Sequence, residues 1–322
     1  MFRMVSNTYS AASLYPSRRG TGISLLTGYL ALYAVTLYAM AAWGHFAADV
    51  ALGVAAVLGA GFSIGAWLLT IGVRPLTHQV WQPGTELLVL GVYIIPLVGV
   101  VTWGFDALRR AIPNDPAQAV ALLVLKLVVF VAIPAWIMSW RFGYSWKELA
   151  PSASGTSHML AVVGMAFLLL LFQSTAGRGL RDISAAHVSG ETMLWGVPLA
   201  FAWLALEAGV VEEFFFRCLL QSRLSAALRS ELGGIVLMAL LFGLIHAPGL
   251  YLRTSVTQEG LPAHPALWMA IGYSIVITSV AGFFLGVLWA RTRNLAVVVL
   301  VHAAADLLPD FLPTLRSLHL LP

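Results

Sequence analysis

The stretch QAVALLVLKLVVFVAIPAWIMSW, residues 118–140, contains a single charged side chain, Lys126. The hydrocarbon core of a bilayer is about 30 Å thick, and about 20 apolar residues in a helix cross it. Only helices and closed barrels can span lipid, and the alternating pattern of a barrel strand is absent from this stretch. It therefore predicts a transmembrane helix.

The composition of the whole chain agrees with this prediction. Of 322 residues, 60% are hydrophobic and 10% are charged, whereas soluble domains carry about 25% charged residues. The mean hydropathy is +0.87. So much apolar surface cannot be hidden from water inside a soluble domain of this size, so we expect a lipid bilayer to surround the chain.

Eight further apolar runs have the length of a span and are separated by polar segments. They cover residues 23–43, 50–73, 86–105, 158–174, 193–221, 232–248, 267–290 and, in a shorter run, 295–308. We predict an all-α fold, a polytopic transmembrane helical bundle of about 8–9 spans. It consists of a polar N-terminal tail over 1–22, transmembrane helices over 23–174, and a further set over 175–322 that carries the motifs described below, all in one membrane domain.

The first run contains Ala39-Met40-Ala41, which resembles a signal-peptidase site. The apolar part of a signal peptide is about 7–15 residues long, and this run is longer, so we expect the first helix to be retained. The one cysteine, Cys218, excludes an intrachain disulfide, and we expect it to be a small buried apolar side chain.

The net charge of +4 comes from dispersed Lys and Arg residues. No basic run with interleaved aromatic residues indicates a nucleic-acid partner. With nine spans, more Lys and Arg fall on the N-terminal side of the membrane than on the other, which predicts a cytoplasmic N-terminus. The N-terminal side collects Arg3, Arg18, Arg19, Arg74, Arg141, Lys147, Arg223, Arg229, Arg291 and Arg293, and the other side Arg109, Arg110, Arg178, Arg181, Arg253 and Arg316.

Charged residues within spans usually mark function, because each costs about 2.5–3.5 kcal/mol at the bilayer centre. Glu213 and Arg217 are four residues apart, so they are neighbours on one helix face and can form a bidentate ion pair. Glu212 lies about 100° away around the helix. Arg217 neutralises it less well, and a desolvated carboxylate is a competent general base. Taken alone, this segment also fits an ordinary salt bridge near a helix end.

Two more motifs follow in the last third of the chain. His246 comes four residues after Phe242, near the end of a span, where a lone histidine is more often a hydrogen-bonded core residue. His302 and Asp306 lie one helical turn apart, with alanines between them that allow close approach of another backbone. On its own, this pair could also be a structural His–Asp hydrogen bond that holds two helices together.

Together, the three motifs resemble the CAAX protease and bacteriocin-processing (CPBP, also called Abi) family of intramembrane proteases. Its pattern is two glutamates with an arginine four residues after the second, then Phe-x-x-x-His, then His-x-x-x-Asn or Asp. Phe216, immediately before the arginine, and the segment Arg291-Thr292-Arg293-Asn294 also resemble that family. The resemblance covers roughly residues 195–310.

The resemblance implies a glutamate-type endopeptidase that cleaves a membrane-anchored protein or peptide without a cofactor. It implies that Glu212 activates water with His246, and that His302 and Asp306 bind the oxyanion. Glu213, Arg217 and Phe242 would support them. An ionised Asp306 cannot donate a hydrogen bond as asparagine does, so Asp306 either orients His302 or is a protonated donor. We favour orientation.

Lys126 and Glu207 remain as possible intramembrane charge partners for each other. Two other classes of function stay open. Glu212 and the two histidines could hold a metal ion, although His-Glu-x-x-His is absent. The chain could instead be a non-catalytic membrane protein, such as a proton-coupled carrier or an immunity or scaffold protein. From the resemblance and the arginine placement we predict a bacterial inner (cytoplasmic) membrane.

Overall fold

The computed structural model describes residues 18–113, 116–257 and 259–321. These residues form helices and connecting loops, with no strand among them. The first helix begins at Arg19, so the end of the predicted polar tail is helical, whereas residues 1–17 of that tail lie outside the described residues.

Nine helices in the described part of the chain are long and apolar enough to cross a bilayer. The first five spans come from the N-terminal half. They are α1 (Arg19–Gly44); α2, η2 and α3 (Ala48–Val54, Ala55–Phe62 and Ser63–Leu69); α4, η3 and α5 (Pro83–Gly99, Val100–Gly104 and Phe105–Ala111); α6, η4 and α7 (Pro116–Leu127, Val128–Ala132 and Ile133–Phe142); and α9 (Thr156–Ala176).

The last four spans carry the charged motifs. They are α11, η5, η6 and α12 (Gly190–Leu204, Ala205–Val210, Glu213–Gln221 and Ser222–Leu228); α13 and α14 (Glu231–Ile245 and Ala247–Tyr251); α15, η7 and α16 (Leu267–Tyr273, Ser274–Thr278 and Ser279–Thr292); and α17 (Leu295–Ser317). Two short helices, α8 (Trp146–Leu149) and α10 (Gly179–Ala185), lie in loops. The all-α polytopic fold is thus confirmed.

Three spans end six or more residues later than the sequence predicts, and the second ends earlier, at Leu69 instead of 73, where residues 70–72 form a turn. The third ends at Ala111 instead of 105, the sixth at Leu228 instead of 221, and the ninth at Ser317 instead of 308. The predictions stopped where apolar side chains give way to charges or proline. A helix is held by its backbone hydrogen bonds, so it can continue after its side chains have become polar.

The ninth span passes through Pro309 and Pro313. Proline has no N–H, so Pro309 leaves the carbonyl oxygen of Ala305 without its helical donor. The side-chain amide of Gln173, from α9, donates to that oxygen instead. A polar residue of the neighbouring span thereby satisfies the freed backbone group, which is how membrane helices tolerate proline.

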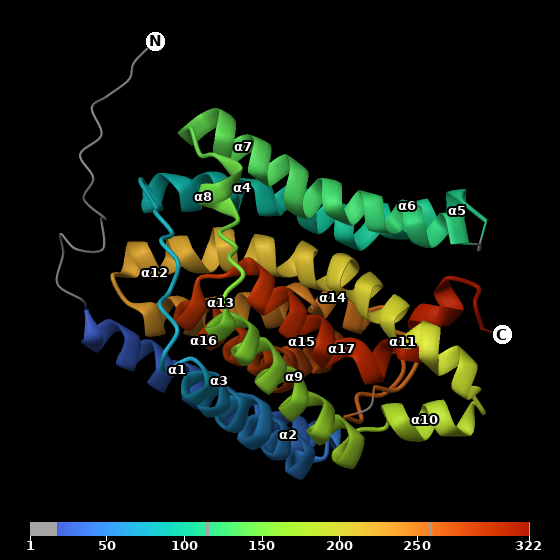
Figure 1. The fold of residues 1–322 in the computed structure, drawn as a ribbon. Coiled ribbons are helices and arrows are strands. Elements are labelled where there is room, and N and C mark those ends of the chain that lie inside the picture. The colour runs from blue at the N-terminus through green and yellow to red at the C-terminus, as the bar shows by residue number, and fades with distance from the viewer. Residues whose placement is uncertain (1–17, 114–115, 258, 322) are drawn as a thin grey trace.

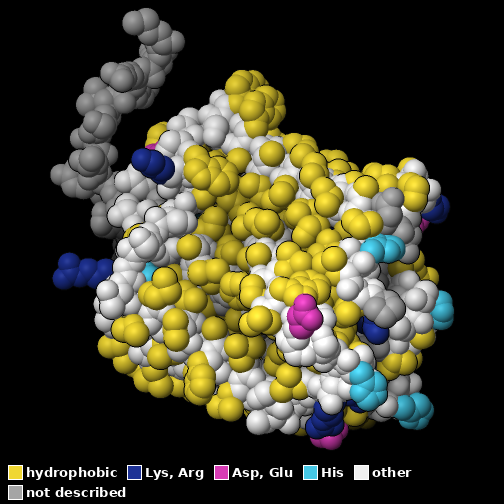
Figure 2. Space-filling view, turned by 45° about the vertical axis from the view of Figure 1, so that its right-hand side comes forward, with side chains coloured by type: hydrophobic (Ala, Val, Ile, Leu, Met, Phe, Trp, Pro, Cys, Tyr) yellow, Lys and Arg dark blue, Asp and Glu magenta, His cyan; other side chains and the backbone are white. Residues whose placement is uncertain are grey.

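The last three spans form the centre of the bundle. Buried residues make up 50%, 72% and 61% of their most apolar windows, compared with 11% in the second and third spans. In Figure 1 the third and fourth spans lie along one side of this centre, and the first two lie on the opposite side. Figure 2 shows a largely hydrophobic surface with most Lys and Arg toward its margins, as expected where lipid surrounds the protein.

Loops that follow the even-numbered spans meet the N-terminal end of α1 at one end of the bundle. Backbone bonds join Arg18 to Arg229 and Leu76 to Thr292, and the Asn294 side chain donates to the carbonyl of Ala153. We call this end, with residues 18–19, 70–82, 141–155, 222–231 and 291–295, the basic end. It gathers the described Lys and Arg residues that the sequence placed on the N-terminal side.

Candidate active site

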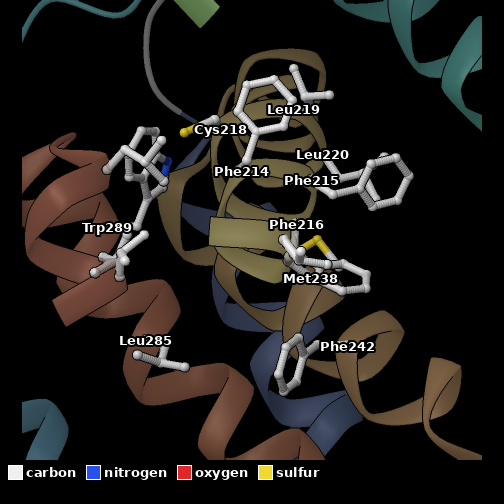
Figure 3. Packing of buried hydrophobic residues seen from close by; sticks show 14 of the residues in the cluster. Phe214, Phe215, Phe216, Cys218, Leu219, Leu220, Met238, Phe242, Leu285 and Trp289 are labelled. Carbon is white, nitrogen blue, oxygen red and sulfur yellow. The ribbon is translucent and has the colours of Figure 1, made fainter. Parts of the chain in front are cut away.

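The two glutamates lie where the sixth span changes its helical winding. The π-helical stretches η5 and η6 flank Val211 and Glu212, and Glu213 opens the second stretch. Such stretches are rare and are frequently found at functional sites. Every residue from Glu213 to Gln221 is buried, and the aromatic rings of Phe214, Phe215 and Phe216 pack among neighbouring spans (Figure 3). The surrounding core therefore holds this segment rigidly.

Glu213 is fully buried, and its two carboxylate oxygens contact two different side chains, those of His302 and Arg217. Its Oε1 atom lies 2.8 Å from Nδ1 of His302, and its Oε2 atom lies 3.1 Å from Nε of Arg217. Arg217 is also fully buried, and its guanidinium lies over the ring of Phe242, 4.7 Å from the centroid. A carboxylate can only accept hydrogen bonds, so Nδ1 of His302 carries the proton. Glu213 thus fixes the orientation of His302.

Glu212 has a different environment. Its side chain is 23% exposed, and its two oxygens lie 3.9 Å from Nε2 of His246 and 4.0 Å from Nε2 of His302. Both distances are too long for direct hydrogen bonds, but one water molecule between each pair could bond to both atoms. Glu212 is therefore placed to share water with two imidazoles rather than to form a closed ion pair.

The backbone sets the tautomer of His246. Its Nδ1 atom lies 2.7 Å from the carbonyl oxygen of Phe242, the i−4 position. A carbonyl can only accept, so Nδ1 carries the proton and, in the neutral ring, Nε2 presents a lone pair toward Glu212. The ring of Phe242 packs on the same imidazole at 4.9 Å between centroids. His246 can thus accept a hydrogen bond from a water molecule beside Glu212.

Asp306 contacts the other nitrogen of His302. Its Oδ2 atom lies 3.3 Å from Nε2, while Glu213 occupies Nδ1. Glu213, rather than Asp306, thus holds Nδ1, and Asp306 contacts the same ring nitrogen, Nε2, that faces Glu212. Both ring nitrogens of His302 therefore lie next to a carboxylate oxygen, which can only accept. This arrangement suits a protonated imidazolium, because it donates a hydrogen bond from each nitrogen. Asp306 is then an acceptor on the side that faces Glu212.

The structure therefore brings together all seven motif residues that the sequence singled out. Glu212, Glu213 and Arg217 come from the sixth span, Phe242 and His246 from the seventh, and His302 and Asp306 from the ninth. From Leu295 to His302 the helix rise amounts to about 10 Å. The cluster lies at about that distance from the basic end, inside the membrane-spanning region.

Comparison with known proteins agrees with this cluster. Residues 194–308 match the family model for type II CAAX prenyl endopeptidase, Rce1-like. The segment is similar to this family, and we refer to it as the Rce1-like domain. The match is consistent with the CPBP family, and that family supports an intramembrane protease activity. No curated protein and no solved structure matches the chain.

The Rce1-like domain contains every one of the seven motif residues, whereas two cavities beside it involve earlier spans. The smaller cavity, about 180 Å³, is lined by Glu212 and His246 together with residues of the third and fourth spans. One water molecule needs about 10–15 Å³ of such space. The space beside Glu212 is thus large enough for water and part of a substrate.

The larger cavity, about 400 Å³, is lined by Asp306 and has both polar and apolar walls. It extends past Glu207 and Asp310 to Arg109 at the end of the third span and Ser317 at the end of α17. Both of these residues lie at the end of the bundle opposite the basic end. This cavity gives water a route to the cluster in the Rce1-like domain.

Lys126 and Glu207, the two residues suggested as charge partners, do form an ion pair. Lys126 comes from α6, outside the Rce1-like domain, and Glu207 comes from η5 inside it. Lys126 lines the smaller cavity and Glu207 lines the larger one. The ion pair therefore stands between the two cavities.

A second buried network, which was not predicted from the sequence, lies at the basic end. Nε of Arg223 lies 2.8 Å from Oε2 of Glu86, both side chains are fully buried, and the Tyr144 hydroxyl donates to the other oxygen at 2.9 Å. We had placed Arg223 only among the topology-setting arginines and Glu86 only at the start of a span. A glutamate inside the first turn of an otherwise apolar helix was the available signal.

His78, in the loop between the second and third spans, packs against the same network. Its Nε2 donates to the carbonyl of Cys218 at 3.0 Å. Burial, together with the nearby cations of Arg223 and Arg293, lowers the pKa of His78 to about 3. Cys218 itself is fully buried, as expected for a small apolar filler. These contacts attach the N-terminal spans to the Rce1-like domain.

Among the described residues, no group of three or more His, Cys, Asp or Glu side chains is arranged to hold a metal ion. Cofactor independence remains a prediction from the resemblance, and a chelator experiment below tests it.

Proposed function

We propose that this chain is a glutamate-dependent intramembrane endopeptidase that hydrolyses a peptide bond in a membrane-anchored protein or peptide. The observation that carries the proposal is the position of the Glu212 carboxylate, which lies 3.9 and 4.0 Å from two imidazole nitrogens inside a membrane-spanning bundle. A general base must lie within reach of the proton that it removes, directly or through one water.

Water activation follows from the hydrogen-bonding roles at the site. A water between Glu212 and His246 would donate one hydrogen to the carboxylate and the other to Nε2, because both groups are acceptors. Its oxygen lone pairs would then be free to attack the carbon of the scissile carbonyl. As the new C–O bond forms, the proton passes to Glu212 and the carbonyl electrons move to the oxygen. Transfer of that proton to the leaving nitrogen would accompany cleavage of the C–N bond.

Negative charge that develops on the carbonyl oxygen needs a donor, and His302 is the group available. With Nδ1 held by Glu213 at 2.8 Å, Nε2 of an imidazolium points toward Asp306 and Glu212. Donors preorganised in this way are usually the largest electrostatic contribution to acyl-transfer catalysis, about 10²–10³ in rate for one donor. Glu213, Arg217 and Phe242 act as positioning residues for His302 and the sixth span.

The membrane and orientation form part of the same proposal. We infer a bacterial cytoplasmic membrane with the N-terminus in the cytoplasm, so that the basic end faces the cytoplasm. The two cavities are compatible with this arrangement, since the larger one reaches Arg109 and Ser317 at the opposite end and the smaller one borders the third and fourth spans. Reporter fusions after Arg229 and after Ser317 would check the orientation, with the first on the cytoplasmic side and the second on the opposite side.

Comparative proteomics of membrane fractions tests the activity. Cells that carry the wild-type chain should accumulate new peptide termini within or next to membrane anchors, and cells that carry Glu212→Ala should not. Glu191→Ala is the matched control, because Glu191 is an exposed glutamate of the same span. Identical termini in wild type and Glu212→Ala would refute the proposal. Loss of activity of the purified enzyme after chelator treatment, with recovery on addition of Zn²⁺, would favour the metal-dependent alternative.

A further inference from the structure

Among the Lys and Arg ion pairs of the described residues, three have both side chains buried or half-buried, and one of these three differs from the other two. The side chains of Arg217–Glu213 and Arg223–Glu86 are all 0% exposed. Those of Lys126 and Glu207 are 24% and 29% exposed, and each lines a cavity. An ion pair that is completely buried in the core can only hold its helices and side chains in place. A pair open to a cavity beside a reactive carboxylate can exchange its partner for a ligand.

The smaller cavity has one strongly basic side chain, Lys126, among its described lining residues. The rest of the lining combines the Glu212 and His246 side chains with apolar walls from Val101, Phe105, Phe130, Val211, Phe216 and Ile245. An anion that entered this space would meet the charge of Glu212, and Lys126 supplies the compensating charge. An ammonium has three donors, and Oε1 of Glu207 uses one of them.

We propose that Lys126 is a specificity-determining residue that binds a carboxylate of the peptide substrate, near the bond that is cleaved. Glu207 holds the ammonium in place when the site is empty and releases it when the substrate carboxylate takes its position. The apolar walls accept the neighbouring side chains of the peptide. This inference rests on the proposed protease function. It adds a recognition element from the fourth span, outside the Rce1-like domain.

Two kinds of substrate carry such a carboxylate, a peptide with a free C-terminus and one with an acidic side chain close to the cleaved bond. Three fluorescent peptides of otherwise equal apolar sequence separate them. One ends in a free carboxylate, one ends in a carboxamide, and one ends in a carboxamide but has glutamate in place of one apolar residue near that end. Their binding is measured on full-length protein in detergent with the Glu212→Gln substitution, so that no turnover is needed.

We expect the protein with intact Lys126 to bind at least one carboxylate peptide about 10- to 100-fold more tightly than the plain carboxamide peptide, as for a charge-assisted hydrogen bond. Which of the two binds identifies the source of the carboxylate. Lys126→Met should reduce the preference to about 1. Glu207→Gln should strengthen carboxylate binding by about 3- to 10-fold, because the competing anion is gone. Lys126→Gln, which keeps a polar side chain, should behave like Lys126→Met.

The two substitutions break the same ion pair, so a merely structural role would make both weaken binding together. Equal binding of the carboxylate and carboxamide peptides, or weaker carboxylate binding in Glu207→Gln, would overturn the inference. Hydrolysis by the enzyme with Glu212 intact is assayed in parallel with the same peptides. Cleavage without a carboxylate preference refutes only the role of Lys126. A Lys126-dependent preference without any cleavage supports the binding site and refutes the proposed protease function.

Discussion

Replacing Glu212 with glutamine and replacing Glu213 with glutamine make the same chemical change at adjacent positions in one helix. The structure nevertheless predicts opposite consequences. Glu213 is fully buried and balances the charge of the fully buried Arg217. Glu212 is 23% exposed, and its oxygens come no closer than 3.9 Å to an imidazole nitrogen. The first substitution should damage the fold, and the second should damage the chemistry.

The magnitudes follow from the contacts. Glu213→Gln leaves a buried guanidinium without its counter-ion, which costs about 3–5 kcal/mol. Glu212 makes no bond of that kind, and Glu212→Gln should change the free energy of unfolding by less than about 1 kcal/mol. The loss of a general base should lower the rate by about 10²–10⁴-fold. At roughly 2 °C per kcal/mol for a large domain, the melting temperatures should fall by about 6–10 °C for Glu213→Gln and by about 2 °C or less for Glu212→Gln.

Both variants are purified in the same detergent, and thermal unfolding is followed by tryptophan fluorescence together with hydrolysis of a peptide that the wild-type enzyme cleaves. Glu191→Gln, at an exposed position, controls for the substitution itself. Arg217→Met should also be destabilising, since it leaves Oε2 of the buried Glu213 without its guanidinium partner. Equal melting temperatures for the two glutamate variants, or an active Glu212→Gln enzyme, would refute the division of roles.

Three further predictions concern other parts of the structure. Asp306→Asn should lower activity without changing the melting temperature much, because the charge next to Nε2 of His302 is lost, and a fully active variant with a broader alkaline range would instead identify Asp306 as a protonated donor. Gln173→Leu should destabilise the protein by about 1–3 kcal/mol, because the Ala305 carbonyl, four residues before Pro309, then has no side-chain donor; Gln79→Leu, at an exposed loop position, serves as the control, and equal unfolding curves would contradict the explanation. The folded-state pKa of His78 lies below its unfolded value, so its contribution to stability is complete above about pH 6.5 and is lost as the pH falls toward 3. Between pH 6.5 and 5 this loss should amount to about 1 kcal/mol after allowance for partial exposure, and His78→Gln should remove that part of the pH dependence of chemical unfolding.

Part of the cluster within the Rce1-like domain could be predicted from the sequence, because some of its contacts join residues only four positions apart. Glu213 with Arg217, and His302 with Asp306, are pairs at helical spacing, and the structure finds them within 3.1 and 3.3 Å. The nine spans could also be predicted, because the free energy of a side chain in lipid depends mainly on that side chain. Some of their bounds were misjudged, mainly where polar residues or proline continue the helix.

The partners between distant spans could not be predicted in the same way. Glu213 is linked to His302, 89 positions away, and Arg223 to Glu86, 137 positions away. Whether Lys126 meets Glu207 likewise depends on how the fourth and sixth spans pack.

The amino-acid sequence by itself predicted a polytopic helical bundle of about 8–9 spans and which helices carry its ionisable groups, and nine helices of the described residues are long and apolar enough to span. Hydrophobicity and helical spacing act within one segment, so they can be read along the chain. Only the tertiary structure decided that Glu213, rather than Asp306, holds Nδ1 of His302, that Glu212 stays open to a cavity, and that Lys126 stands beside it. Those contacts arise from the packing of whole helices, in which a rotation or shift of one span changes every partner at once.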